Sequence, residues 1–83
     1  MQVKTVHIHF DTIEDIKTFV SEVSKFDASF NVQSGRYIAN GKSILGMFSL
    51  DFSKDLTVRI EVASNDPDDM YEILYALKPY IRK

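Results

Sequence analysis

Apolar and polar residues alternate in two stretches of this chain, and a period of two is typical of half-buried strands. In residues 2–10 the pattern runs through Val6, Ile8 and Phe10, with polar side chains between them. In residues 56–63 the alternating apolar positions are Leu56, Val58, Ile60 and Val62. Both stretches are predicted to be strands that turn one face toward a core.

Two other stretches carry apolar residues three or four positions apart, which predicts helices with one core face. The first covers residues 13–26, with apolar positions Ile13, Ile16, Phe19, Val20, Val23 and Phe26. Asp11 or Thr12 is expected to cap it, because each has an acid three residues later. The second is expected to begin after an Asp66 N-cap with Pro67 in its first turn, and Pro79 is expected to bend or end it. Its apolar positions are Met70, Ile73, Leu74, Leu77 and Ile81.

The middle of the chain predicts two short strands and a short helix. Residues 28–33 and 36–40 read as strands around a turn at Ser34 and Gly35, and Asn40-Gly41 is a second turn signal. Residues 43–50 are too densely apolar for a surface strand and are interpreted as one or two helical turns with Ser43 as the N-cap. The order βαββαβα favours an α+β domain over residues 1–83, with helices on one face of an antiparallel sheet.

The charge and composition of the chain argue against several classes of function. The net charge of −2 disfavours broad electrostatic binding to nucleic acid. The chain has no cysteine, which excludes disulfides and thiol catalysis. No apolar run approaches the ~20 residues of a membrane span, and residues 1–7 lack the apolar core of a signal peptide. We therefore expect a cytoplasmic protein without a nucleic-acid or membrane partner.

Three segments at matching places in this order resemble HPr, the small phosphocarrier of the bacterial sugar phosphotransferase system. The first is similar to the end of the first HPr helix, and the other two resemble the segment around its regulatory serine: Ser24-Lys25-Phe26-Asp27, Asn40-Gly41-Lys42-Ser43-Ile44 and Gly46-Met47-Phe48-Ser49-Leu50. The resemblance implies the HPr open-faced β-sandwich. That fold is a four-stranded antiparallel sheet with two long helices and one short helix on one face.

The loop that carries the phosphoacceptor in HPr has no counterpart here. HPr proteins place a Gly-Ile/Leu-His-Ala-Arg-Pro run between the first strand and first helix, and its histidine takes phosphate from enzyme I. Residues 10–16 contain no His, Arg or Pro, and carry Asp11, Glu14 and Asp15 instead. Carboxylates would repel a phosphoryl group and compete for the helix N-terminus. Histidyl phosphotransfer at this position is predicted to be absent.

His7 and His9 are the histidines that remain, and both are expected on the polar face of the first strand. A displaced phosphoacceptor at either position is one alternative function. A two-histidine metal site is another, but no third ligand is evident from the sequence, so we expect solvent-facing residues, no metal and no cofactor.

The segment after Asn40-Gly41 holds the candidate regulatory and docking residues. An N-cap role alone explains Ser43. The resemblance to HPr implies that Ser43 is phosphorylated by an HPr kinase. Lys42, the preceding residue, is expected to pair with the phosphate. It also implies that outward apolar side chains of this segment dock on partner proteins, and the candidates are Leu45, Met47 and Phe48.

The sequence therefore predicts a non-catalytic HPr-like regulatory module whose partners are proteins. The expected partners are a phosphotransferase-system protein, a catabolite-regulation protein or an HPr kinase. No nucleophile–base pair or phosphate-cradling loop predicts enzymatic activity. Besides the displaced-histidine carrier, a ferredoxin-like small-ligand-binding domain is a further alternative, distinguished by its lack of a short helix at residues 43–50.

Overall fold

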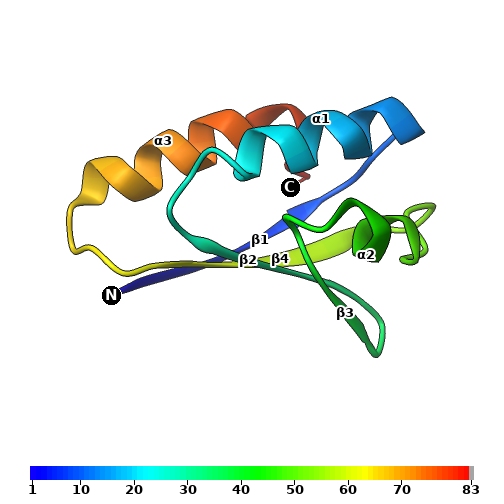
Figure 1. The fold of residues 1–83 in the computed structure, drawn as a ribbon, viewed down its shortest axis with the longest axis horizontal. Coiled ribbons are helices and arrows are strands. Elements are labelled where there is room, and N and C mark those ends of the chain that lie inside the picture. The colour runs from blue at the N-terminus through cyan, green and yellow to red at the C-terminus, as the bar shows by residue number, and fades with distance from the viewer. Residues whose placement is uncertain (83) are drawn as a thin grey trace.

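Four strands and three α-helices follow one another within residues 1–82, which are the residues described by this computed structural model (Figure 1). Their order along the chain is β1 (Gln2–Ile8), α1 (Ile13–Val23), β2 (Ser29–Ser34), β3 (Tyr37–Asn40), α2 (Ile44–Phe48), β4 (Leu56–Val62), α3 (Pro67–Leu77) and the 3₁₀ turn η1 (Lys78–Tyr80). The strands form one antiparallel sheet in the order β1-β4-β2-β3. The predicted α+β class and the element order are confirmed.

The centre of the sheet is apolar on the side that faces the helices. On β4, Val58 lies opposite Val6 of β1 and opposite Val32 of β2. Leu56 pairs with Ile8 in the same register. All five side chains are buried, because successive residues of a strand point to opposite faces and these share one face.

The two long helices lie side by side over this face of the sheet, as Figure 1 shows. Each contributes three fully or nearly buried residues at helical spacing: Ile16, Phe19 and Val23 from α1, and Met70, Ile73 and Leu77 from α3. Each helix has 11 residues. Within residues 1–82 no helix is both long and apolar enough to cross a membrane.

An aromatic cluster closes the core where β1 leads into α1. The Phe10 ring centroid lies 5.3 Å from that of Phe19 and 5.4 Å from that of Tyr80, and the rings meet edge to face. This is the arrangement that aromatic quadrupoles favour. Burial raises the pKa of the Tyr80 hydroxyl above its ordinary value, and the negative charges of Asp15 and Glu22 raise it further.

The first helix is shorter than the sequence predicts. It ends at Val23, where the prediction extends to residue 26. The Ser24 hydroxyl donates to the Val20 carbonyl at 2.6 Å, a local bond that competes with continuation of the helix. Phe26 still packs against the core from the following loop. Ile13, expected on the core face, is exposed at the first position of α1.

The last helix ends at Leu77, two residues before Pro79. Pro79 has no backbone N–H with which to continue the α-helical hydrogen bonds, and the chain passes into the 3₁₀ turn η1. Ile81 was predicted on the helix, but it lies beyond it and forms an antiparallel bridge with Ile8. The C-terminal segment thus covers one end of the free edge of β1.

Candidate functional site

A tight turn leads the chain from β3 into α2. The Gly41 N–H donates to the Phe30 carbonyl at 2.7 Å, and the Ser43 N–H donates to the Asn40 carbonyl at 2.9 Å. The Ser43 hydroxyl then accepts a hydrogen bond from the Gly46 N–H at 3.2 Å. Ser43 is therefore the N-cap of α2, and its side chain is exposed.

Glycine is required at position 41 by space and not by backbone conformation. A Cβ there would lie 2.9 Å from the Phe30 Cβ and 3.3 Å from the Val32 Cγ2. Within residues 1–82 the residue with a positive φ is Gly35, at 58°, so the turn at Asn40 and Gly41 forms without one. The turn before α2 therefore packs closely against β2 only because residue 41 has no side chain.

The three apolar candidates of α2 differ in exposure. Leu45 is 80% exposed and Phe48 is 40% exposed, so both are available to a partner. Met47 is 0% exposed and belongs to the core, so its assignment as a docking contact is wrong. Side chains two positions apart on a helix point in different directions, and α2 uses Met47 to hold itself on the sheet. Ile44 is partly buried against the same core.

Lys42 does not present its charge to Ser43 in this structure. Its Nζ donates to the Phe26 carbonyl at 2.7 Å and lies 5.9 Å from the centre of the Phe30 ring. The ammonium group is thus held by the loop after α1, and the contact of Lys42 with a partner or with a phosphate on Ser43 stays a prediction. Lys42 joins the start of α2 to the loop after α1.

The start of α1 is capped by a hydroxyl and occupied by carboxylates. The Thr12 hydroxyl accepts from the Asp15 N–H at 3.2 Å, so of the two predicted caps the structure uses Thr12. The Asp15 carboxylate in turn accepts from the Asp11 N–H at 3.1 Å. Glu14 adds a further negative charge to the first turn. The protein's own acids therefore take the positive end of the helix dipole.

His9 lies just beyond β1, beside this acidic helix start. Its Nδ1 is 3.1 Å from an Asp55 carboxylate oxygen, and its Nε2 is 3.6 Å from one of Asp11. The Nδ1 contact has the distance of an ion pair but not the direction of a hydrogen bond, so we interpret it as electrostatic proximity. The Arg82 guanidinium is 3.5 Å from the same Asp11 oxygen. Two acids thus lie beside His9, and neither pairing was evident from the sequence.

Sequence reasoning missed Asp55 and Arg82 because both are far from His9 along the chain and no local pattern joins them. The other histidine, His7, is exposed on the open face of the sheet, with its Nδ1 3.3 Å from the Thr57 hydroxyl oxygen. His9 is mostly buried instead, so the two do not share a solvent-facing strand surface. Within residues 1–82 no group of three or more histidines, cysteines or acids is arranged to hold a metal ion.

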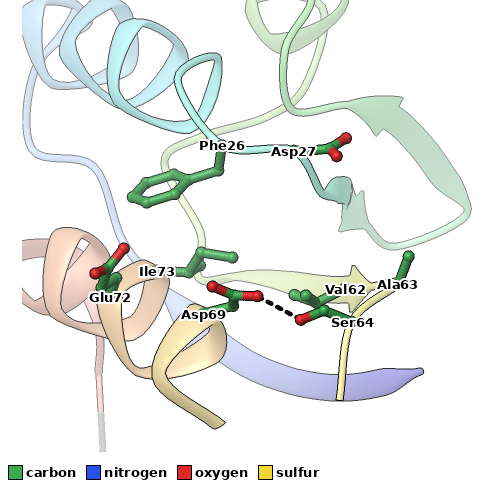
Figure 2. A pocket seen from close by; sticks show the side chains of 8 residues that line it. All are labelled: Phe26, Asp27, Val62, Ala63, Ser64, Asp69, Glu72 and Ile73. Carbon is green, nitrogen blue, oxygen red and sulfur yellow. Dashed lines mark hydrogen bonds between the residues drawn. The ribbon is translucent and has the colours of Figure 1, made fainter. Parts of the chain in front are cut away.

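A pocket with a volume of about 170 Å³ lies at the C-terminal end of β4, between α3 and the loop after α1 (Figure 2). It is lined by Phe26, Asp27, Val62, Ala63, Ser64, Asp69, Glu72 and Ile73. The Ser64 hydroxyl donates a short hydrogen bond to the Asp69 carboxylate. Three carboxylates in its lining make this pocket unsuited to phosphate. None of the predicted site residues lines it.

A family model described as "PTS HPr component phosphorylation site" matches residues 15–80 of this chain. The chain therefore belongs to the HPr family of the sugar phosphotransferase system. The match begins inside α1, so the acidic residues Asp11 and Glu14 lie outside it. Between β3 and β4 the structure contains α2, which the ferredoxin-like alternative lacks, and that alternative is excluded.

Solved HPr structures share the fold. The phosphocarrier protein HPr from Bacillus anthracis str. Ames is 21% identical, with a TM-score of 0.68 over 90% of this chain and 94% of its own. HPr-C-His from Thermoanaerobacter tengcongensis is 23% identical, with a TM-score of 0.67 over 94% of this chain and 92% of its own. These similarities establish the open-faced β-sandwich.

Proposed function

We propose that this chain is a non-catalytic HPr-like regulatory module, a single domain over residues 1–83 that binds protein partners and does not carry phosphate on histidine. The observation that carries the proposal is the set of carboxylates at the start of α1. In HPr the corresponding loop offers a histidine, a cation and backbone N–H groups to a phosphoryl group. Here Thr12 and Asp15 accept hydrogen bonds from backbone N–H groups of this segment.

The charge around His9 also opposes phosphate transfer. A histidine nucleophile needs a neutral imidazole and a cationic neighbour for the incoming phosphoryl group. His9 instead has the carboxylates of Asp11 and Asp55 within 4 Å. Two unit charges 4 Å apart repel by ~1 kcal/mol in bulk water and by ~4 kcal/mol near a protein surface. A phosphoryl group would meet this repulsion from both sides.

The surface offered to partners is the exposed side of α2, formed by Ser43, Leu45 and Phe48. Two exposed apolar side chains beside a hydroxyl make a small docking patch that a charge change would alter. A phosphate on Ser43 would add about −1.5 to −2 charges at the edge of this patch. We therefore propose Ser43 as the site through which an HPr kinase regulates binding to a catabolite-regulation protein.

The test incubates the protein with phosphoenolpyruvate and enzyme I, and separately with ATP and an HPr kinase. An authentic HPr serves as positive control in both reactions. We expect no acid-labile phosphate in the first reaction and one acid-stable phosphate, mapped to Ser43, in the second. An acid-labile phosphate on a histidine would overturn the proposal. Unchanged mass with the kinase, or phosphate on Ser49 or Ser53, would remove the regulation by Ser43.

Docking is tested separately with Leu45→Asp, because Leu45 is the most exposed apolar residue of α2. Binding to an HPr-responsive transcription factor should be lost in this variant, while thermal stability stays within about 0.5 kcal/mol of the parent. The matched control is Ile38→Asp, at an exposed apolar residue on β3. Equal binding by the parent and Leu45→Asp would move the docking surface away from α2.

One observation favours the displaced-histidine carrier as a second candidate. His9 and Arg82 both lie beside Asp11, so an imidazole and a guanidinium flank the same carboxylate just before α1. If His9 accepts phosphate, Asp11→Asn should increase acid-labile labelling by enzyme I and His9→Gln should abolish it. Failure of both the parent and Asp11→Asn to take label would exclude this candidate.

A further inference from the structure

The helix α3 is apolar on two sides, and the core uses only one of them. Met70, Ile73 and Leu77 are buried beneath it. A second stripe, offset by one residue, consists of Tyr71, Leu74, Tyr75 and Lys78, and together with Ile81 it lines an open groove of about 490 Å³. Both tyrosines of this stripe are 68% exposed. Positions separated by three, four and seven residues are the spacing with which one helix packs against another.

The charges at the ends of the stripe are opposite in sign. Asp68 lies in the first turn of α3 and Lys78 just past its last residue. Among residues 1–82, neither side chain takes part in an ion pair. The positions of Asp68 and Lys78 are symmetric about Ile73, and so are those of Tyr71 and Tyr75. When the helix is reversed, the two end charges therefore pair with each other and so do the two tyrosines, while Leu74 comes opposite Glu72.

We propose that the occupant of this groove is a second copy of the chain, docked through α3 with the two helices antiparallel. A two-fold axis at the height of Ile73 along the helix, on the exposed side opposite its buried side chain, would place Asp68 of each copy opposite Lys78 of the other, and Tyr71 of each opposite Tyr75 of the other. Such a two-fold contact is isologous, because the same patch serves both copies. A parallel pair would instead bring like charges together, which is unfavourable.

The interface is small, so the dimer is expected to be weak. An 11-residue helix is about 16 Å long at 1.5 Å per residue. Contacts below ~1,200 Å² of total buried area are typical of transient association. We expect a dissociation constant on the order of 0.1 mM, with edge-to-face or offset tyrosine pairs as its main source. The exposed side of α2 is not part of this contact, so the proposal stands apart from the proposed function.

Sedimentation equilibrium of the full chain between about 0.05 and 1 mM tests the proposal, because this range brackets the expected constant. We expect a mass that rises from that of the 9.5 kDa monomer toward twice that value. Asp68→Lys alone and Lys78→Asp alone should each weaken dimerisation at least about tenfold by placing like charges opposite each other. An equimolar mixture of the two variants should restore it, since each then meets its complement.

Two further variants keep the test independent of the helix ends. Tyr75→Ser removes part of the apolar stripe and should weaken the dimer, whereas the matched control Tyr37→Ser, at a tyrosine of β3 that is 75% exposed, should not. Thermal unfolding of every variant verifies that it is folded. A monomer at the highest concentration, a dimer that tolerates Tyr75→Ser, or a mixture that fails to restore association would each overturn the antiparallel α3 pair.

Discussion

The starts of α1 and α2 have the same local geometry and opposite surroundings. In each, a side-chain hydroxyl accepts a hydrogen bond from the N–H group three residues later: Thr12 accepts from Asp15 and Ser43 from Gly46, both at 3.2 Å. The first turn of α1 carries acids, whereas that of α2 carries none and exposes Leu45. The two helix starts share their capping chemistry and differ in their neighbouring charges.

The two helices also differ in what holds them in place. An isolated helix shorter than ~12 residues is marginal in water, so both depend on tertiary packing. α1 buries three residues along 11 positions, but α2 has five residues and buries only Met47. The docking surface proposed for α2 therefore depends on one internal side chain, and the comparison can be tested by removing it.

The largest effect is expected for Met47→Ala. Truncating a fully buried Met to Ala costs about 2–5 kcal/mol, which is the lost burial plus the cavity that remains. The matched control is Leu45→Ala, which should change the free energy of unfolding by less than about 0.5 kcal/mol. Urea denaturation followed by circular dichroism measures both. Similar losses for the two variants would mean that α2 is rotated relative to the arrangement described above.

The next largest effect is expected for Gly41→Ala. Overpacking against Phe30 and Val32 should lower the free energy of unfolding by about 1–3 kcal/mol. The control is Gly35→Asn, because the space around Gly35 is open and asparagine tolerates positive φ. We expect its melting temperature to stay close to that of the parent. If Gly41→Ala unfolds at the same temperature as the parent, the turn before α2 is not tightly packed on β2.

The sequence predicted the framework well, because periodicity and capping are local. The alternation around Val58 and the Ser43 cap could be read directly. The inward side chain of α2 could not, since Ile44, Leu45, Met47 and Phe48 are all apolar and the pattern does not say which one faces the sheet. Burial of Met47 depends on how the turn before α2 packs on β2, which is a tertiary property.

The charged residues at the start of α1 were likewise predictable from the sequence only in part. Asp11, Glu14 and Asp15 lie close together in the sequence, so a helix start occupied by carboxylates was predictable. The contacts of His9 with Asp55 and of Asp11 with Arg82 join segments from opposite parts of the chain. They require the sheet register and the bridge of the C-terminal segment to β1.

Removing the N-cap hydroxyl of either helix compares α1 with α2 directly, with a smaller expected effect than that of the two core substitutions. Thr12→Ala and Ser43→Ala should each lower the free energy of unfolding by about 1 kcal/mol. The consequences should differ locally, because the five-residue α2 has less packing to hold it after its cap is lost. Amide hydrogen exchange should accelerate at Gly46 and Met47 in Ser43→Ala, but stay slow in the middle of α1 in Thr12→Ala. Equal local protection in both variants would contradict the unequal support of the two helices.

The smallest effect concerns the carboxylate that follows α2. The Asp51 side chain accepts hydrogen bonds from the Ser53 hydroxyl at 2.5 Å and from the Ser53 N–H at 3.1 Å. These bonds favour the charged form and hold the pKa of Asp51 below its ordinary value of 3.8. Because the folded pKa is the lower one, the carboxylate stabilises this turn at pH above 3.8, and that contribution is lost as the pH falls through the folded pKa.

Ser53→Ala removes the stronger of the two bonds, so the pKa of Asp51 should rise toward 3.8. Carboxyl-carbon NMR titration measures the shift. Ser49→Ala is the matched control, since the Ser49 hydroxyl donates to the Gly46 carbonyl and not to Asp51. An unchanged Asp51 pKa in Ser53→Ala would show that the Ser53 hydroxyl does not stabilise the charged carboxylate. The predicted shift would show that Asp51, the acid after α2, is stabilised by hydrogen bonds within its own turn. The acids of α1 lie instead at the start of a helix.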